Sequence, residues 1–356
     1  MFYRTFNPGP SQISDAVKAD IASASEQNII GISHRSSAFI DITEKAVHGL
    51  RKFFKVPADY HVLFTSSASE AMELTIRNLV NATSFHFTNG HFSELFSNMS
   101  IALGKKAIND SVEWGKQNKH DQAVIPTEAE IITITYNETS TGVTCDNKTI
   151  RNLSKKAADK LLVVDITSVA GCLPLEIDVA DVWLFSVQKG MGLPSGLGIM
   201  FISPRAHNRS QQQQHTGLFN FSAMAHKMVD YQTIHTPNVL GIYLLAKQLE
   251  RWNKSDAPSN YEATRSKAAL LDDFISSHMQ LDYFVKLASA RSQTTVCITA
   301  IPEVINRLLH AAKDANLVIG AGYGKLKSTT CRIANFPALS SSDMKHLIKV
   351  LSQVLN

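Results

Sequence analysis

One lysine stands in the stretch of sequence best suited to covalent chemistry. Lys189 follows the apolar run Asp181–Ser186 and opens a glycine-rich turn containing Gly190 and Gly192. Glycines in such a turn let a bulky ligand approach the backbone closely, because they carry no Cβ atom. A lysine in a dry pocket has a depressed amine pKa, and its neutral amine can attack an aldehyde to form a Schiff base. A lone lysine after a strand is more often a solvated strand end, so the chemical interpretation needs a partner group.

Asp165 is the partner that the sequence offers. It ends the apolar run Leu161–Asp165, and the segment between it and Lys189 is long enough for one strand–connection–strand unit. Both side chains would then emerge at the same region of a sheet. A carboxylate there can keep the nitrogen of a pyridine ring protonated, so that the ring accepts electrons when a substrate loses its Cα proton. An aspartate at a strand end also serves as a turn or cap residue, but the pairing with Lys189 favours the chemical role.

Short apolar or β-branched runs recur between helical patterns and predict the strands that position these residues. They are His61–Thr65, Ser84–Thr88, Ile131–Thr135, Leu161–Asp165, Asp181–Ser186 and Gly198–Ser203. Several are apolar throughout, which is typical of strands covered on both faces. We therefore expect a large mixed-sheet α/β sandwich domain, with the ligand chemistry at the loops that follow strand ends.

The last third of the chain predicts a second, smaller α+β domain. A helical pattern over Val239–Arg251 leads into helix Tyr261–His278, strand Thr294–Ala300, helix Glu303–Ala315, strand Thr330–Phe336 and helix Ser341–Leu355. We expect a cofactor-binding domain over residues 1–240, whose segment 1–15 docks near the site, and a C-terminal domain over residues 241–356. The glutamine-rich stretch Arg205–His215 is expected to be a surface loop or helix edge.

Composition limits the classes of protein. A chain of 356 residues with 44% hydrophobic and 19% charged residues fits a two-domain globular enzyme, expected to be soluble, cytoplasmic and without a membrane partner. A net charge of +4 without a long basic run gives no support to nucleic-acid binding. The cysteines lack paired spacing, so neither a disulfide framework nor a metal site is expected; they are Cys145, Cys172, Cys297 and Cys331.

Several further motifs carry a family resemblance over nearly the whole chain. They are Asn7-Pro8-Gly9-Pro10, Ser33-His34-Arg35-Ser36, Asn137-Glu138-Thr139 followed by Gly142, Gln188-Lys189, and Ile234-His235-Thr236-Pro237 with Tyr243. In this order the motifs resemble those of the class V aminotransferases of the phosphoserine and alanine–glyoxylate type. The resemblance implies a fold type I transferase that depends on pyridoxal 5′-phosphate, with Lys189 and Asp165 as its catalytic residues.

The resemblance also implies contacts to that cofactor. Ser67, Ala68 and Ser69 end a strand and open the helical pattern Glu70–Leu79, so their backbone amides form an anion site for the cofactor phosphate; a serine N-cap is the plain alternative and is compatible. Phe92 falls where the family places an aromatic that stacks on the ring, although an isolated aromatic is more often core. Thr139, Ser168 and Gln188 complete the expected contacts, with a buried strand-end threonine as the alternative for Thr139.

Residues from a second subunit are implied in the same way. His235 and Thr236 would reach the phosphate of the other subunit's cofactor, although the family usually has asparagine at the position of His235. His34 and Arg35 match residues that bind the distal anionic group of the substrate across the dimer interface. A homodimer with shared active sites is therefore expected.

The α-carboxylate of the substrate is assigned to Arg332. This arginine lies in the largely apolar strand Thr330–Phe336, where an unpaired guanidinium is costly and where its planar fork suits bidentate capture of a carboxylate. An ion pair with a neighbouring acid is the alternative. Lys325 is the nearby candidate for a distal phosphate, because lysine binds phosphate as a point charge.

The resemblance favours a phosphoserine:2-oxoglutarate aminotransferase of serine biosynthesis. Two departures keep an alanine–glyoxylate or serine–pyruvate type as the alternative: Glu70 stands near a position where phosphoserine enzymes carry arginine, and Gly322–Lys327 lacks their His-Arg pair. A cysteine desulfurase-like lyase is disfavoured by Gln188 and by the strand position of Cys331. A non-enzymatic cofactor-binding protein is disfavoured because the lysine, the aspartate and the arginine are all present.

Overall fold

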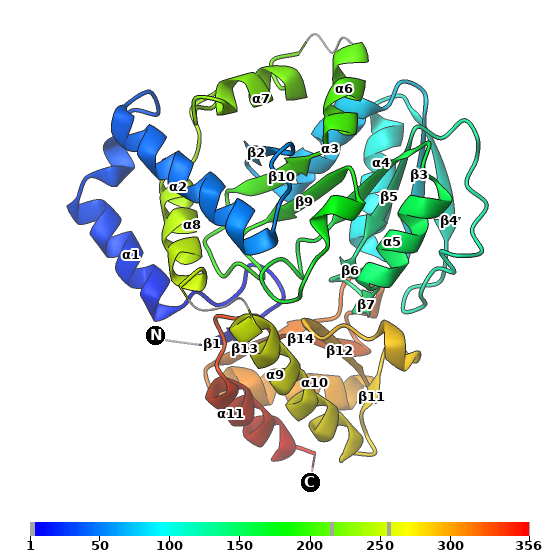
Figure 1. The fold of residues 1–356 in the computed structure, drawn as a ribbon. Helices are drawn as coiled ribbons and strands as arrows, with labels where there is room; N and C mark the ends of the chain where they lie inside the picture. The colour runs from blue at the N-terminus through cyan, green and yellow to red at the C-terminus, as the bar shows by residue number, and fades with distance from the viewer. Residues whose placement is uncertain (1–3, 214–216, 255–257, 356) are drawn as a thin grey trace.

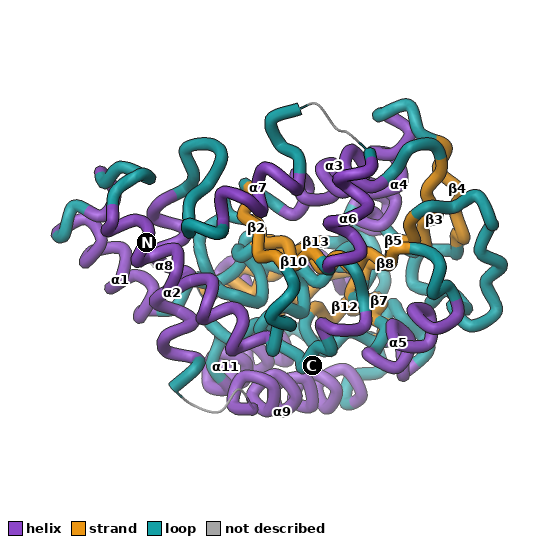
Figure 2. The backbone as a smooth tube through the Cα atoms, turned by 45° about the horizontal axis from the view of Figure 1, so that its top comes forward, coloured by secondary structure: helices purple, strands orange, loops and turns teal. Residues whose placement is uncertain are grey.

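The structure is a computed structural model that describes residues 4–213, 217–254 and 258–355. In these ranges a large sheet is flanked by helices on both faces, and a smaller sheet with its own helices lies below it in Figure 1. Figure 2 shows the same strands as the middle layer of the molecule, with helices outside them. The architecture is the expected α/β sandwich with a smaller α+β unit.

The large sheet is mixed and has seven strands in the order β2-β10-β9-β8-β5-β3-β4. Only β10 runs against its neighbours, since it pairs antiparallel with both β9 and β2 while the other pairs are parallel. Six strands lie within one residue of the predicted bounds. The strands are β2 (His61–Thr65), β3 (Thr83–Thr88), β4 (Lys106–Ser111), β5 (Ile131–Thr135), β8 (Leu161–Asp165), β9 (Val182–Ser186) and β10 (Gly198–Ile202).

Helices cover both faces of this sheet, which explains why its central strands are apolar throughout. One face packs against α3 (Ala68–Leu79), α4 (His91–Ala102), α6 (Pro204–Gln212) and α7 (Phe221–Met228). The other face packs against α1 (Asp15–Glu26), α2 (Ser37–Phe54), α5 (Asn147–Lys156) and α8 (Val239–Trp252).

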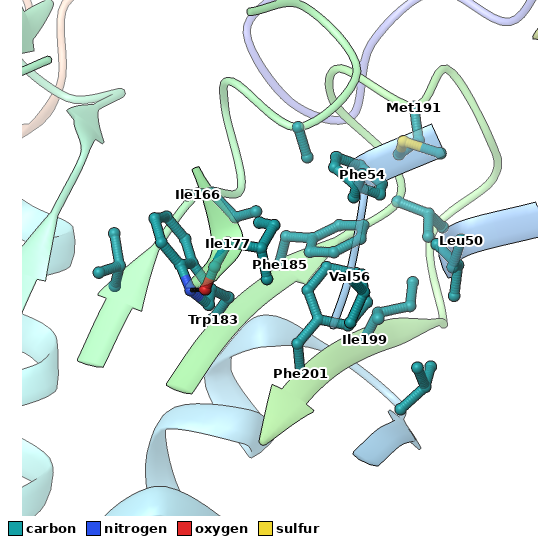
Figure 3. Close-up of a cluster of buried hydrophobic side chains, with 14 of the residues drawn as sticks. Leu50, Phe54, Val56, Ile166, Ile177, Trp183, Phe185, Met191, Ile199 and Phe201 are labelled. Carbon is teal, nitrogen blue, oxygen red and sulfur yellow. Dashed lines mark hydrogen bonds between the residues drawn. The ribbon is translucent and has the colours of Figure 1, made fainter. Parts of the chain in front are cut away.

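An aromatic cluster fixes β9, the strand that leads to Lys189. Phe54 of α2 lies with its ring centroid 5.4 Å from that of Phe185 and 5.6 Å from that of Phe201. The Trp183 indole N–H donates to the Ile177 carbonyl over 2.7 Å, so this large side chain is buried with its polar atom satisfied. Figure 3 shows these side chains converging from α2, β9 and β10. Truncating one such buried ring costs about 3–5 kcal/mol, so the end of β9 is firmly placed.

The smaller sheet has the strand order β1-β13-β14-β12-β11. Its strands are β1 (Arg4–Phe6), β11 (Asp282–Tyr283), β12 (Thr295–Thr299), β13 (Leu317–Ala321) and β14 (Thr330–Ala334), and its helices are α9 (Pro258–Ser276), α10 (Pro302–Asp314) and α11 (Ser341–Ser352). The predicted strands and helices of this region are present. The strands β1 and β11 are too short to show a period of two, and the sequence did not reveal them or β13.

The sequence places the boundary between the two domains after residue 240. In the structure α8 packs into the core of the large sheet through Ile242, Leu244 and Leu249. Phe6 of β1, in contrast, packs into the core of the smaller sheet, because β1 pairs with β13. We therefore propose two units that follow the cores, with α8 in the larger unit and β1 in the smaller one.

The glutamine-rich stretch belongs mostly to a helix. Its residues up to Gln212 lie in α6, whose N-cap Ser203 accepts from the Ala206 amide over 3.1 Å; its last two residues, 214 and 215, lie outside the described residues. None of the helices in the described ranges is both long enough and apolar enough to span a membrane.

Candidate active site

Lys189 lies just beyond the end of β9 and is buried, with the residue only 7% exposed. The amine Nζ donates to Oγ1 of Thr139 over 2.7 Å and lies 4.6 Å from the centroid of the Phe92 ring. Gly9 of the amino-terminal segment packs on the aliphatic stem, because a Cβ atom at Gly9 would lie 2.9 Å from the Lys189 Cε atom. Ser11 adds backbone contacts, donating from its amide to the carbonyl of Gln188 over 3.0 Å.

Burial disfavours the charged form of this amine. Burial is the largest effect and lowers the pKa of the Lys189 amine to about 8. The charge of Arg332 also lowers this pKa, whereas the charges of Asp165 and Glu138 raise it. A neutral amine is therefore far more accessible here than in a solvated lysine. The geometry supports attack on an electrophilic carbon beside Phe92.

Asp165 ends β8 at the same edge of the sheet. β8 and β9 are parallel neighbours, with Asp165 opposite Leu184, so their carboxyl ends meet as the strand–connection–strand interpretation predicts. One carboxylate oxygen, Oδ1, accepts from the amide and the hydroxyl of Thr167 over 2.8 and 2.5 Å. The second oxygen has no hydrogen-bond partner among the described residues. Burial raises the pKa of Asp165, while the Thr167 hydrogen bonds and the Lys189 charge act in the opposite direction.

The amino-terminal end of α3 lies beside the end of β9. The Ala68 amide donates to the Ser186 hydroxyl over 2.6 Å, which ties the first turn of the helix to the strand that leads to Lys189. Ser67 is the N-cap and accepts from the Glu70 amide over 3.1 Å. The Glu70 carboxylate folds back and accepts from the Ser66 amide. The amide of Ser69 has no partner in the described part of the chain, so it is open to an anion.

The loop of a short hairpin contacts Lys189 through Thr139. β6 (Asn137–Glu138) pairs with β7 (Val143–Thr144), and Thr139 follows β6 directly. The Ser168 hydroxyl, which is expected to contact a cofactor, donates to the Asn137 carbonyl over 2.7 Å and accepts from the Asn137 side chain over 2.8 Å, which leaves one of its acceptor lone pairs free. Ser168 thus connects the Asp165 loop to the Thr139 loop.

Arg332 reaches Thr139 from β14 of the smaller sheet. It donates to the Ala321 carbonyl over 3.0 Å and to the Thr139 carbonyl over 3.1 Å, and its guanidinium lies 5.4 Å from the centroid of the Tyr323 ring. Burial lowers its pKa. It forms no ion pair within the described residues, so a structural ion pair has no support. A carboxylate ligand would therefore meet an uncompensated cation.

We call these convergent residues the Lys189 group; its members are Lys189, Asp165, Phe92, Thr139 and Arg332. Two residues predicted from the sequence lie at its margin. The Gln188 side chain is half-buried and makes no hydrogen bond among the described residues. Lys325, in the 3-10 turn Gly324–Leu326, is exposed and its Nζ lies 4.9 Å from the centroid of a Trp114 ring.

Four other predicted residues form a separate cluster, the His34 group: His34, Arg35, His235 and Thr236. Arg35 donates to the side chain of Gln232 over 2.8 Å and to the carbonyl of Thr233 over 3.0 Å. Burial and the charges of Arg35 and His235 lower the pKa of His34. No hydrogen bond, ion pair or ring contact between described residues joins this group to Lys189 or Asp165. Within one subunit the structure therefore brings these four together but leaves them apart from the lysine.

Sequence reasoning missed several contributors to the Lys189 group. Glu138 is fully buried beside Thr139, and Tyr323 packs on Arg332, on Phe92 and, at 4.5 Å between ring centroids, on His91. A glutamate next to a predicted site threonine was the available signal for Glu138. The contacts of Tyr323 join residues distant in sequence, and no local pattern indicates them.

Comparisons with known proteins point to one family. Residues 5–324 match the family model described as aminotransferase class-V. The crystal structure of a phosphoserine aminotransferase from Cytophaga hutchinsonii is 33% identical, with a TM-score of 0.95 and coverage of 99% of this chain and 98% of that one. A relative named phosphoserine aminotransferase from Rhodococcus opacus is 26% identical over 99% of this chain and 95% of its own length. An alanine–glyoxylate aminotransferase from Nostoc sp., at 21% identity and a TM-score of 0.83, covers 100% of this chain and 96% of its own and shares the fold.

Proposed function

Because this chain belongs to the class V aminotransferases, we propose that it transfers the amino group of phosphoserine to 2-oxoglutarate. As a member of that family it is an enzyme of fold type I that depends on pyridoxal phosphate. The single observation that carries the proposal is the Lys189 group: a buried amine of lowered pKa and an unpaired guanidinium meet at one threonine, next to an aspartate with a free oxygen. A role in serine biosynthesis and a cytoplasmic location are parts of the same proposal.

The residues present fit pyridoxal 5′-phosphate. The free oxygen of Asp165 is available to a pyridinium N–H, Phe92 offers a ring face beside the Lys189 amine, and the Ser69 amide at the start of α3 is open to a phosphate. When bound, the cofactor supplies an aldehyde carbon for the amine and an aromatic ring that takes up electrons. We propose Ser67, Ala68, Ser69, Phe92, Thr139 and Gln188 as its contacts, with Ser168 acting through Asn137 as a support.

Each member of the Lys189 group then has a defined task. The Lys189 amine would hold the cofactor through its aldehyde carbon and would serve as the base for the proton on the substrate Cα atom. Asp165 would hold a proton on the ring nitrogen, because a buried carboxylate is stabilised by a charged N–H donor. Thr139 orients the amine through its hydroxyl, and the ring of Phe92 excludes water from the amine.

Arg332 is proposed to bind the α-carboxylate of the substrate. Its guanidinium keeps donor atoms free beyond the carbonyls of Ala321 and Thr139, and a carboxylate gives a charged partner in place of a neutral one. Tyr323 holds the guanidinium plane from one side. A substrate bound there has its Cα atom directed toward the amine that shares Thr139.

A homodimer completes the proposal. The His34 group is remote from Lys189 in its own subunit, and the exposed apolar residues Leu218 and Val229 flank α7 at 61% and 72% exposure. An interface over such residues stabilises association by burying apolar surface. We propose that the partner subunit supplies His34, Arg35, His235 and Thr236 to each site, where they meet the substrate phosphate and the cofactor phosphate.

An alanine–glyoxylate type of activity is the second candidate, and Glu70 favours it. Its carboxylate lies at the beginning of α3, where it takes the Ser66 amide, and it would oppose a second anion in that region. The exposed position of Lys325 on Trp114 also leaves the distal subsite with less fixed positive charge. The phosphoserine assignment rests on the 33% identical relative of that name.

A cysteine desulfurase-like activity lacks structural support. All four cysteines are buried, and burial raises the pKa of the Cys331 thiol well above its usual range. A desulfurase-like reaction needs an accessible thiolate, which this chain does not offer. A non-enzymatic cofactor-binding role is equally unsupported, because it does not explain why Lys189, Asp165 and Arg332 are assembled together.

A substrate panel tests the proposal. The purified protein, loaded with pyridoxal phosphate, is assayed with phosphoserine and 2-oxoglutarate, with glutamate and phosphohydroxypyruvate, and with alanine and glyoxylate. We expect the phosphorylated pairs to give the higher kcat/KM. Faster turnover of alanine with glyoxylate would move the chain to the second candidate, and no turnover with any pair would reject the function.

A further inference from the structure

Thr139 connects the two cations of the site. Its hydroxyl accepts from the Lys189 amine over 2.7 Å, and its carbonyl accepts from the Arg332 guanidinium over 3.1 Å. Any group that fixes Thr139 therefore acts on the amine that does the chemistry and on the guanidinium proposed to bind substrate. The residue before it in the chain, Glu138, is such a group.

Glu138 is a carboxylate that is fully buried and forms no ion pair among the described residues. Its Oε2 atom accepts from the Ser93 amide over 2.9 Å. Its Oε1 atom accepts from the amide and the hydroxyl of Ser140 over 3.1 and 2.7 Å. All three partners donate, which fits an ionised carboxylate, and the amino-terminal end of α4 favours a negative charge at that point.

The same hydrogen bonds place Phe92. The amide of Ser93 binds Glu138 directly, and the amide of His91 donates over 2.9 Å to the Ser140 hydroxyl, which in turn donates to Glu138. The amides on both sides of Phe92 thus lead to one carboxylate. The Phe92 ring that this arrangement orients is the one facing the Lys189 amine.

Gly90 shows how closely α4 approaches this carboxylate. A Cβ atom at Gly90 would lie 2.4 Å from the Cγ atom of Glu138 and 2.6 Å from the hydroxyl of Ser140. Any larger residue would separate the helix from Glu138, so glycine is required for packing and not for an unusual backbone angle. The contact is built to bring the start of α4 onto Glu138.

The charge of Glu138 also reaches both cations. It raises the pKa of Lys189, together with the larger effect of Asp165 and against that of Arg332. The Glu138 charge also raises the pKa of Arg332. The charged groups that shift the pKa of the Lys189 amine are therefore Asp165, Arg332 and Glu138. Glu138, which lies on the hairpin, shifts the pKa of both Lys189 and Arg332.

We propose that Glu138 is a positioning residue of the reaction: its ionised carboxylate holds Phe92 and Thr139 against Lys189, and its negative charge limits how tightly Arg332 binds a carboxylate. This inference deepens the proposed function and rests on it. The negative charge of Glu138 keeps the Lys189 nitrogen more protonated. It also weakens the binding of a carboxylate to Arg332, so that a product carboxylate can leave. Glu138 contacts neither substrate nor amine itself, so it acts through the residues beside it.

The decisive experiment compares Glu138→Gln with Asp181→Asn in the cofactor-loaded full-length protein. Asp181 is a matched control: it is buried, it accepts from the Leu162 amide and the Ser203 hydroxyl, and it lies at the opposite end of β9. The first measurement is the pH midpoint at which the visible absorption band of the Lys189-bound cofactor changes. Loss of one nearby buried charge is expected to lower this midpoint by about one to two pH units in Glu138→Gln. Asp181→Asn should leave it unchanged.

The second measurement is the affinity for propionate, a carboxylate with neither an amino nor an oxo group. Glu138→Gln should bind propionate about 3- to 30-fold more tightly because a repelling charge is gone, and should show a lower KM together with a lower kcat. A purely structural role would raise KM and weaken propionate binding. An unchanged midpoint, or weaker propionate binding, in a folded Glu138→Gln would overturn the inference.

Glu138→Asp keeps the inference testable if Glu138→Gln does not fold. The shorter acid retains the charge but withdraws it from the Ser93 amide, so kcat should fall while the absorption midpoint stays within about half a pH unit of wild type. A midpoint shifted in Glu138→Asp as far as one to two units would contradict the electrostatic role. A wild-type protein that binds no cofactor would instead reject the proposed function, whereas a normal wild type with unaltered Glu138 variants would reject only this inference.

Discussion

The Lys189 group and the His34 group differ in how completely one subunit surrounds them. In the first, Lys189 and Asp165 are buried and each is oriented by hydrogen bonds from neighbouring loops. In the second, Arg35 and Thr236 are exposed, and the buried Nδ1 atom of His235 has no hydrogen-bond partner among the described residues. The difference fits the proposal that the bond-making chemistry lies within one chain and that a second subunit completes the binding of the distal anion.

The two groups also differ in the free-energy cost of burying their charged side chains. A buried lysine and a buried aspartate need fixed partners, because an unpaired buried charge is expensive. Arg35 and Thr236 of the His34 group are exposed, so their polar atoms can be solvated without fixed partners in the protein. Substitutions in the first group should therefore abolish the reaction, and substitutions in the second should change which substrate is preferred.

The largest effect is expected for Lys189→Ala. Without the amine nothing holds the cofactor carbon or moves the Cα proton, so turnover should fall by roughly four orders of magnitude or more. The purified wild type should be yellow, and borohydride reduction followed by peptide mapping should locate the pyridoxyl label on Lys189. A label on another lysine would break the assignment of the Lys189 group.

Asp165→Asn should have the next largest effect. An amide is isosteric with the carboxylate but cannot stabilise a protonated ring nitrogen, so kcat should drop by about 10²- to 10⁴-fold while the protein stays folded and yellow. Steady-state kinetics beside a thermal unfolding curve measure both. Turnover close to wild type would show that the ring partner lies elsewhere.

Acid should weaken the sheet beneath the Lys189 group through His86. This side chain is fully buried, its ring nitrogens contact Ser84 and Thr133 over 2.7 Å each, and burial lowers its pKa from 6.5 to about 3. The unfolded chain takes up the proton first, so stability is full above pH 6.5 and is lost as the pH falls toward 3. The expected contribution is on the order of 1.4 kcal/mol per pH unit, or about 100-fold in the folding equilibrium at about pH 4.5.

Urea unfolding at about pH 7 and about pH 4.5 measures this effect. The difference between wild type and His86→Gln isolates His86 from the carboxyl groups that titrate in the same range. His34→Gln is the matched control from the His34 group, since His34 is only half-buried. An equal change of pH dependence in both variants would contradict the contrast between the two groups.

The sequence predicted those parts of the fold that depend on local pattern. The central strands were recognised because both faces are covered, which makes runs such as Leu161–Asp165 apolar throughout. The edge strand β4 was missed because one side of it is solvated and its residues are polar, as in Lys106–Ser111. Pairs of residues at the ends of adjacent parallel strands, such as Asp165 and Lys189, were predictable from topology alone.

What the sequence could not predict depends on contacts between distant segments. Gly90, the N-cap of α4, lets the helix approach the buried Glu138 closely, and the two residues are far apart in the chain. The interaction of Arg332 with Thr139 joins two sheets. No motif in the sequence indicates that the His34 group lies apart from Lys189 within one subunit.

The smallest expected effect is a change of substrate preference in Arg35→Ala. If the partner subunit brings Arg35 to the distal phosphate, its loss should cost about 2 kcal/mol, or roughly 30-fold in kcat/KM, for phosphohydroxypyruvate and little for glyoxylate. The effect is at the low end for a charged contact because Arg35 is exposed and shares its donors with Gln232 and Thr233.

Arg332→Ala serves as the reference variant. It should lower kcat/KM for both acceptors alike, since each acceptor carries the α-carboxylate. Parallel kinetics of the two variants on the two acceptors, with the oligomeric state measured by light scattering, give the comparison. Equal losses of kcat/KM on both acceptors in Arg35→Ala would show that the His34 group does not complete the site of a neighbouring subunit, and so would full activity in a monomer. Only in a shared site can Arg35, which lies apart from Lys189 in its own subunit, contact the distal end of the substrate.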